Sequence, residues 1–152
     1  MLKERVRRAA KKDLPSVYRI EVEVFGTDAW HPMALGFFLY LDKAVFLVYD
    51  DGGVKGYAIG VAEKAGRGHV LNIAVKPGYR RRGIGSVLLE SLEEELGKLG
   101  AREFYLEVRR DNTGAIAFYE KKGYRSAGVM EKYYSDGCDA VIMWKKGYLL
   151  AR

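Results

Sequence analysis

The hydrophobic pattern is clearest between residues 70 and 99, where an apolar run, a polar turn and a periodic segment follow one another. Residues 70–75 are mostly apolar and partly β-branched, which predicts a buried strand that ends at the following proline and glycine. From residue 84 onward, apolar side chains recur every three or four positions, which predicts an amphipathic helix. These side chains are Ile84, Leu88, Leu92, Leu96 and Leu99. The glutamates at 93–95 are expected on the solvent face of that helix.

Shorter segments of the same two kinds fill the rest of the chain. We expect strands at 4–9, 44–49, 54–63, 102–109, 124–132 and 141–145, and helices beginning near residues 13, 32 and 112. With the segment above, the order is β-α-α-β-β-β-α-β-α-β-β. This order predicts an α/β (mixed α+β) fold, in which a mixed, mostly antiparallel sheet of about seven strands carries helices on both faces.

Three local signals add detail to this outline. Asp13 is a candidate helix cap, and Pro15 follows it in the first turn, where a missing N–H costs nothing. Gly56 and Gly60 lie within one predicted strand, which indicates a bulge or a close backbone neighbour. In the strand at 102–109, Glu107 lies on the face opposite the apolar even-numbered positions.

Length and composition narrow the class of protein. A chain of 152 residues, 49% of them hydrophobic, suits a single domain spanning 1–152 with a substantial core. The net charge of +6 suits an anionic ligand, but the basic residues cluster only at 80–82, which disfavours a nucleic-acid partner. The single cysteine, Cys138, excludes an internal disulfide, and no metal-ligand spacing occurs. Without a signal peptide or an apolar run of membrane length, we expect a cytoplasmic protein that needs no membrane.

The turn before the long helix combines three arginines, Arg80, Arg81 and Arg82, with Gly83 and Gly85. The first N–H groups of a helix have no backbone acceptor, and the helix dipole makes that end positive. Glycine lets a phosphate approach the backbone closely, and the arginine fork matches phosphate oxygens. The turn therefore favours a diphosphate ligand. The alternative is a basic surface turn in which the glycines serve only tight packing.

Three motifs carry a resemblance to a known superfamily, and together with the element order they cover essentially the whole chain. The R-x-x-G-x-G sequence at 80–85 resembles the acetyl-CoA pyrophosphate loop of the GNAT N-acetyltransferases. The segment at 106–124 resembles the CoA-binding and catalytic segment of that family. The segment at 132–140 resembles the Tyr-Tyr hairpin of RimI-type and NatA-type protein N-terminal acetyltransferases. This hairpin separates that branch from amine, antibiotic and histone acetyltransferases.

Within this resemblance, Glu107 matches the general base, acting through water, and Tyr119 matches the residue that protonates the CoA sulfur. Both roles are needed because the amine must lose a proton and the departing thiolate must gain one. The alternatives are a salt bridge from Glu107 to Arg109 or another arginine, and ordinary core packing of Tyr119. The N–H near Val75 is the candidate for holding the carbonyl oxygen as charge builds on it. His69, at the start of the cofactor strand, is either structural or an auxiliary base.

The resemblance also implies which residues contact acetyl-CoA (coenzyme A). The strand end would offer backbone groups to the pantetheine arm, and the turn would hold the diphosphate. Asn112 would both cap its helix and contact the cofactor. The implied set is Ile73, Ala74, Val75, Arg80, Arg81, Arg82, Gly83, Ile84, Gly85, Ser86, Asn112 and Tyr119. No metal is implied.

Two aromatic pairs are expected to form the walls of a substrate groove. Tyr133 and Tyr134 resemble hairpin residues that bind the substrate backbone, and Phe25 and Trp30 occupy the loop that would face them. The alternative for both pairs is simple packing. The chain departs from the family pattern at Cys138, where an acidic residue is common, and this bears on substrate preference.

The function implied is direct transfer of an acetyl group, in a ternary complex, from acetyl-CoA to the N-terminal α-amine of a protein, for example a ribosomal protein. The α-amine titrates at about 7.7–8.0 and a lysine at about 10.4, so the α-amine is the easier nucleophile to generate. The alternatives are a lysine or small-molecule amine acetyltransferase of the same fold, and a CoA-binding module without catalysis. A monomer or a dimer is expected, without nucleic acid.

Overall fold

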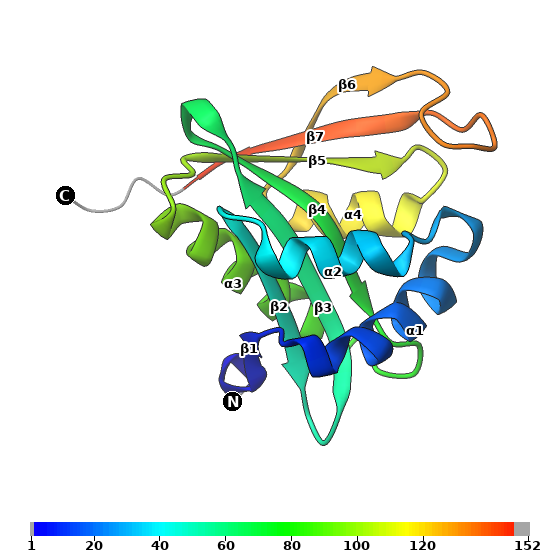
Figure 1. Cartoon of the computed structure of the whole chain (residues 1–152). Coiled ribbons are helices and arrows are strands. Elements are labelled where there is room, and N and C mark those ends of the chain that lie inside the picture. Colours follow the sequence, from blue (N-terminus) through cyan, green and yellow to red (C-terminus); the bar gives the residue numbers. More distant parts are fainter. Residues whose placement is uncertain (1, 148–152) are drawn as a thin grey trace.

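The computed structural model describes residues 2–147. Its strands form one seven-stranded sheet in the order β1-β2-β3-β4-β5-β7-β6 (Figure 1). The strands are β1 (Val6–Arg8), β2 (Ala44–Asp50), β3 (Val54–Ala62), β4 (Arg67–Val75), β5 (Glu103–Arg109), β6 (Arg125–Met130) and β7 (Ala140–Lys146). The α-helices are α1 (Leu14–Phe25), α2 (Pro32–Tyr40), α3 (Ile84–Lys98) and α4 (Thr113–Lys121). Neighbouring strands are antiparallel except β4 and β5, which confirms the predicted mixed sheet.

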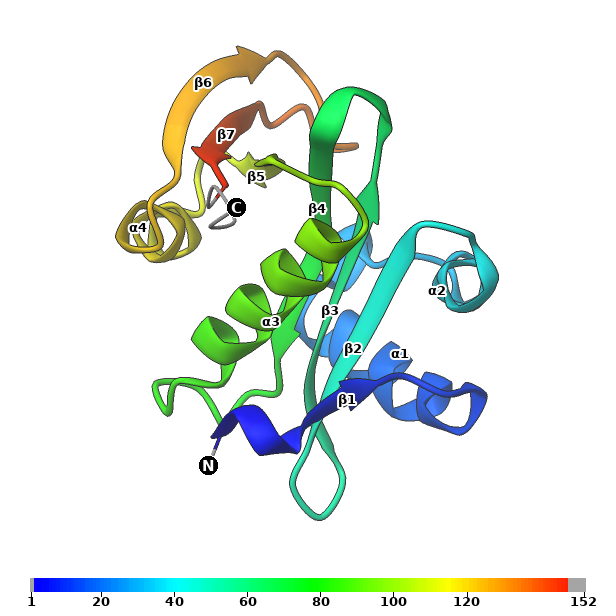
Figure 2. The ribbon, with the colours of Figure 1, turned by 90° about the vertical axis from the view of Figure 1, so that its left-hand side faces the viewer.

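Helices cover both faces of the sheet, as predicted. α1 and α2 lie on one face, and α3 and α4 lie on the other (Figure 2). Each face has its own apolar cluster, since Val17, Ile20 and Leu35 pack beneath α1 and α2, and the α3 leucines pack with Phe104 and Leu106. Within residues 2–147, no helix is long and apolar enough to cross a membrane.

The predicted apolar stripe is the face that α3 buries, except that Leu99 follows the end of the helix and is 37% exposed. Its buried members are Ile84, Leu88, Leu92 and Leu96. Glu93 was expected in solvent and is only 5% exposed, so that prediction is wrong. Its carboxylate accepts hydrogen bonds from the Tyr124 hydroxyl at 2.7 Å and from Lys145 Nζ at 3.0 Å. These partners lie 31 and 52 positions away in the sequence. The local periodicity of the helix therefore could not predict that Glu93 is buried.

The N-terminal segment differs from prediction in two respects. Residues 2–5 form a 3-10 turn, so the first strand begins only at Val6. Asp13 precedes α1, but its side chain makes no capping bond to the helix. Its carboxylate accepts two bonds from the Arg7 guanidinium, at 2.8 and 2.9 Å, and one from the Ala10 N–H at 2.8 Å. An ion pair to β1 therefore takes the place of the predicted cap.

Replacing Asp13 with asparagine should lower the free energy of unfolding by about 2 kcal/mol at neutral pH, because a buried charge-assisted pair is lost. The Arg7 hydrogen bonds hold the pKa of Asp13 below its ordinary value. A depressed pKa stabilises the fold above the unfolded-state value of about 3.9, and this contribution disappears as the pH falls through the folded-state value. Urea unfolding at neutral and strongly acidic pH measures it. A difference between the two proteins that persists in acid would contradict the assignment.

Candidate active site

β4 and β5 form a V-shaped opening in the sheet. They pair over only three residue pairs, in which 67–69 of β4 meet 103–105 of β5. Beyond these pairs β4 continues along β3 and β5 continues along β7, so the two strands diverge (Figure 1). The edge of β4 that faces the opening ends in Ile73, Ala74 and Val75. Backbone N–H and C=O groups on such an edge need partners, and an extended ligand can supply them.

Gly68 lies at the apex of this V. A Cβ on Gly68 would lie 2.7 Å from the Phe104 ring and 3.1 Å from Ala101, which is closer than side chains pack. The missing side chain therefore lets the two strands approach before they separate.

A β-bulge in β4 changes which side chains face α1 and α2. Val70 pairs with Gly60 and Asn72 pairs with Ile59, so Leu71 is an extra residue between them. In consequence Leu71 and Asn72 both contact the α1–α2 side of the sheet. The irregularity predicted from Gly60 is confirmed, although the extra residue belongs to β4 and not to the strand that carries the glycine.

His69 and Glu107 meet across the apex of the V. His69 Nε2 lies 2.8 Å from Glu107 Oε1, and the two side chains are 17% and 16% exposed. On its other side, His69 Nδ1 lies 3.4 Å from Glu63 Oε2, and its ring stacks on Tyr105 at 4.2 Å. The Tyr105 hydroxyl donates to Glu63 Oε1 at 2.6 Å, which fixes that carboxylate. The partner of Glu107 is thus a histidine, and not Arg109, which was the alternative expected from the sequence.

The arginine-glycine turn leads directly into α3. Gly83 has φ of 85°, in the left-handed region that favours glycine, and it caps a 15-residue helix. A Cβ on Gly85 would lie 3.5 Å from the Phe118 ring, so α4 packs against the start of α3. Arg80 Nε donates to the Val75 carbonyl at 3.4 Å, which links the turn to the end of β4. The structure thus brings the turn, the open strand edge and α4 together.

Replacing Gly83 with valine should raise the KM for acetyl-CoA at least tenfold, because a β-branched residue strains the left-handed cap and displaces the turn. Gly52→Val is the matched control. It strains another left-handed glycine, in the β2–β3 hairpin and outside the turn, and should leave that KM nearly unchanged. Calorimetric titration with acetyl-CoA and steady-state kinetics measure both. If a folded Gly83→Val protein binds acetyl-CoA normally, the turn does not belong to the cofactor site.

α4 carries the other predicted cofactor residues. Asn112 Oδ1 accepts the Ala115 N–H at 3.1 Å, so the predicted cap is confirmed. Tyr119 is half-buried, and its ring meets Phe118 and Tyr124 edge-on at 5.2 and 5.7 Å. Burial, and then proximity to Tyr134, raise the pKa of the Tyr119 phenol above its ordinary value. The hydroxyl therefore keeps its proton through the neutral range.

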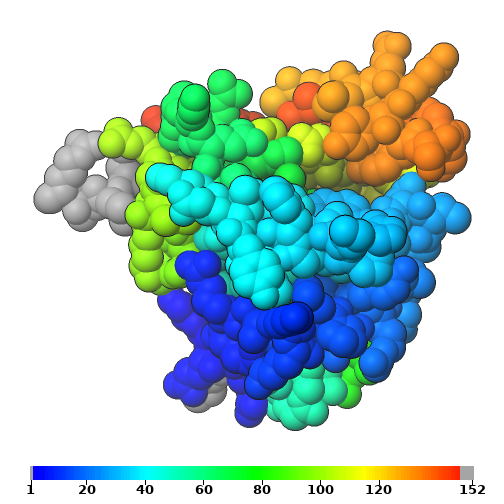
Figure 3. All heavy atoms as spheres, in the orientation of Figure 1, coloured from blue at the N-terminus to red at the C-terminus, as the bar shows by residue number. Residues whose placement is uncertain are grey.

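Arg109 connects the two segments expected to form the substrate groove. Its guanidinium binds Asp28, in the loop after α1, at 2.9 Å and Asp136, in the β6–β7 hairpin, at 2.6 Å. It also lies 4.9 Å from the centre of the Tyr134 ring. In the space-filling view the hairpin (orange) lies directly above the surface of α1 and α2 (Figure 3). Sequence reasoning did not identify Arg109 or these aspartates as groove residues.

The two hairpin tyrosines lie close to the Glu107 carboxylate. Their rings meet edge-on at 5.0 Å. Burial raises the pKa of Tyr134 to about 12, and burial followed by the charge of Glu107 raises the pKa of Tyr133. Tyr133 is also 47% exposed, so it can meet a partner from solvent. The charge of the predicted base thus acts on both predicted hairpin residues.

A pocket of about 340 Å³ opens between α2 and β4. It is lined by Trp30, His31, Ala34, Phe38 and Leu71. The Trp30 and Phe38 rings lie 5.4 Å apart. Leu71 lies two positions from His69 on the same strand, so the pocket adjoins the histidine-carboxylate pair. Phe25 instead packs against the apolar cluster beneath α1, so only one of the two predicted loop aromatics lines this pocket.

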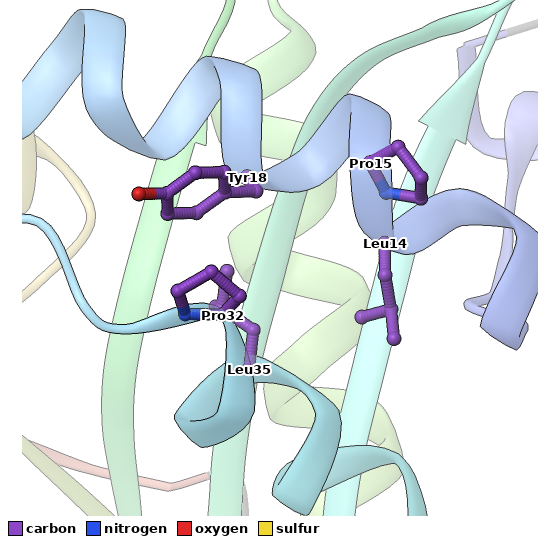
Figure 4. Close-up of a pocket in the computed structure, with 5 residues that line it drawn as sticks. All are labelled: Leu14, Pro15, Tyr18, Pro32 and Leu35. Carbon is purple, nitrogen blue, oxygen red and sulfur yellow. The ribbon is translucent and has the colours of Figure 1, made fainter.

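A second pocket, of about 220 Å³, lies between α1 and α2 (Figure 4). It is lined by Leu14, Pro15, Tyr18, Pro32 and Leu35. None of these residues is a histidine, a lysine or a carboxylic acid, and none lies on β4 or β5. We therefore place the candidate active site at the V-shaped opening.

Comparison with known proteins identifies the family of the chain. The chain matches the acetyltransferase (GNAT) family over residues 6–124. An uncharacterized N-acetyltransferase of Methanocaldococcus jannaschii is 38% identical over 142 residues, covering 93% of this chain and 90% of that protein. Ard1 from Thermoplasma volcanium is similar with a TM-score of 0.85 at 30% identity, covering 94% of this chain and 97% of that one. For the ribosomal-protein-S18-alanine N-acetyltransferase of Escherichia coli, the TM-score is 0.83 at 31% identity, and coverage is 97% and 96%.

The match over residues 6–124 and the similarity to an N-acetyltransferase along nearly the whole chain show that this protein is an N-acetyltransferase. The chain belongs to the GNAT acetyltransferase family. The predicted fold and the predicted transferase activity are thereby confirmed.

Proposed function

We propose that this protein transfers the acetyl group of acetyl-CoA to the N-terminal α-amine of a protein. The observation that carries the proposal is the His69–Glu107 pair, which joins β4 to β5 at the place where the two strands begin to diverge. One relative is named for acetylating an alanine of ribosomal protein S18, which supports an N-terminal acceptor and makes a ribosomal protein a reasonable first candidate.

The residues present suit acetyl-CoA. The N-terminus of α3 and the turn at 80–86 offer backbone N–H groups and guanidinium charge to a diphosphate. The open edge at 73–75 offers backbone partners to an amide-bearing arm, and Asn112 lies at the start of the facing helix. When bound, this cofactor supplies the acetyl group as a thioester.

Residues of the chain accept and donate the protons that the reaction moves. Glu107 accepts the proton that the acceptor amine loses, directly or through water, and His69 at 2.8 Å stabilises the carboxylate or shares that proton. The N–H near Val75 donates to the oxygen on which charge develops. Tyr119 holds its proton at the phenolic oxygen, where the departing sulfur needs a donor. The carboxyl and the phenol then exchange protons with solvent, which restores the starting state.

The shape of the acceptor side favours a chain terminus over a lysine. Arg109, two positions after Glu107 on β5, binds both the loop after α1 and the β6–β7 hairpin. An extended terminus can enter between them, its first side chain resting in the apolar pocket of Trp30 and Leu71. An internal lysine would bring flanking chain on both sides, which the hairpin would obstruct. An apolar first or second residue is therefore the preferred class of acceptor.

A peptide with a free α-amine should be acetylated there at least a hundredfold faster than the same peptide blocked at its terminus and carrying a lysine. Mass spectrometry locates the acetyl group, and a thiol-release assay gives the rates. Tyr134→Phe should raise the KM for the peptide and leave acetyl-CoA binding unchanged, because only a hydroxyl near the acceptor is lost. A faster reaction with the blocked lysine peptide, or with a free polyamine, would replace this proposal with an internal-amine acetyltransferase.

A further inference from the structure

One buried carboxylate on the acceptor side takes no part in the mechanism above. Glu21, in α1, is 1% exposed. Its Oε1 accepts hydrogen bonds from the Tyr57 hydroxyl and from Asn72 Nδ2, the latter at 2.6 Å. Its Oε2 accepts the backbone N–H of Trp30 at 2.9 Å. Tyr57 is itself fully buried in β3, so the network lies inside the protein.

These three donors are all neutral groups. Burying a carboxylate is expensive unless its oxygens are satisfied, and a well-packed apolar side chain at such a place is often at least as stabilising. The neighbouring core residues Val17 and Ile20 are apolar and fill the same face of α1. Stabilisation of the fold therefore does not explain why this position is a glutamate. The hydrogen bonds that its carboxylate makes to other segments explain it better.

The carboxylate connects the two sides of the apolar acceptor pocket. Trp30 lines one side, and its backbone is fixed by Oε2. Leu71 lines the other side, and the next residue, Asn72, is fixed by Oε1. The bulge places both Leu71 and Asn72 toward α1, so the bond to Asn72 holds the strand at the pocket wall. One side chain thus sets the spacing between the loop and β4.

We propose that Glu21 is a positioning residue that fixes the width of the acceptor pocket by holding Trp30 against β4. The proposal rests on the assignment of that pocket to the acceptor. Glu21 touches neither the acceptor nor the reacting atoms. Its effect should therefore appear in the KM for the peptide, while the KM for acetyl-CoA stays constant.

Glu21→Met removes both acceptor oxygens at nearly constant volume and leaves the Trp30 N–H without a partner. We expect the KM for an apolar N-terminal peptide to rise about tenfold, the effect of one unsatisfied buried donor. Glu21→Gln keeps one oxygen for that N–H, so it should restore most of the affinity for the peptide. If the methionine variant does not fold, Glu21→Gln still tests the proposal.

Two variants separate positioning from stability. Asp13→Asn removes a buried carboxylate pair at the opposite end of α1, and Tyr57→Phe removes one donor while the bond to Trp30 remains. Both should lower the melting temperature and leave the KM for the peptide unchanged. If they raise it as much as Glu21→Met does, the effect is general loosening, and the proposal is overturned.

Fluorescence of Trp30 tests the same point without a substrate. The chain has two tryptophans, so Trp144→Phe leaves Trp30 as the single source of tryptophan fluorescence. In that background Glu21→Met should increase acrylamide quenching of Trp30, and Glu21→Gln should increase it less. Unchanged quenching overturns the proposal whatever the kinetics show, and so does an unchanged KM for the peptide in an active protein. If no N-terminal peptide is acetylated by the native protein, the proposed function fails, and the quenching result alone decides whether Glu21 holds the loop.

Discussion

Glu107→Gln should lower kcat by roughly 10²–10⁴-fold, the usual contribution of a positioned general base. The KM for acetyl-CoA should stay nearly constant, because a base acts in the transition state and not in binding the cofactor. Glutamine preserves the size of the side chain and can still bond His69 Nε2, so the apex should keep its geometry. Steady-state kinetics between pH 6 and pH 9, with both substrates varied, measure the effect.

Two further variants test whether this loss of kcat is specific to Glu107. Glu103→Gln changes a carboxylate on the same strand and the same face, four positions earlier, and should leave kcat unchanged. His69→Asn should lower kcat about tenfold if the histidine supports the carboxylate. A loss as large as that of Glu107→Gln would make His69 the base and Glu107 its orienting partner. Full activity of Glu107→Gln at every pH would make the pair structural.

Tyr119→Phe should lower kcat by roughly 10²-fold, because the departing sulfur loses its proton donor. The ring packing against Phe118 and Tyr124 is retained, so stability should change little. Because burial raises the pKa of the native phenol above its ordinary value, Tyr119 should not contribute an alkaline limb to the rate below about pH 10. Pre-steady-state kinetics with excess enzyme isolate the chemical step.

Tyr124→Phe is the matched control for this substitution. Its hydroxyl donates to the buried Glu93 at 2.7 Å, on the α3 side of the sheet. Removing it should lower the melting temperature and leave kcat within about twofold of the native value. Equal losses of kcat in the two variants would show that Tyr119 acts through packing and not as an acid.

The elements of the fold were largely predictable, because periodicity and capping are local properties. Asn112 caps its helix as predicted, and the stripe of α3 is the buried face. The failures occur where a partner distant in sequence decides the outcome. Asp13 turns from its helix to Arg7, and Glu93 is buried because Lys145 and Tyr124 meet it.

The candidate site shows the same division. The motif residues were assigned from the resemblance to a known family, which short local segments carry. The pairing of His69 with Glu107 joins residues 38 positions apart, and that of Arg109 with Asp28 joins residues 81 positions apart. In the sequence, Glu21 looks like a surface glutamate of an amphipathic helix. Only the structure shows that it is buried and accepts three hydrogen bonds. Such contacts depend on how the strands are arranged, which no single segment specifies.

The apex at Gly68 has a consequence for how the protein assembles. β1 to β4 and α1 to α3 come from one continuous stretch of chain, and β5 to β7 with α4 come from the next. The proposed catalytic pair spans the seam, because His69 lies on β4 and Glu107 on β5, so the pair forms only when the two stretches come together. Their approach depends on Gly68, which precedes His69 and lies against Phe104. A side chain at position 68 would push the two strands apart, and we expect it to separate His69 from Glu107.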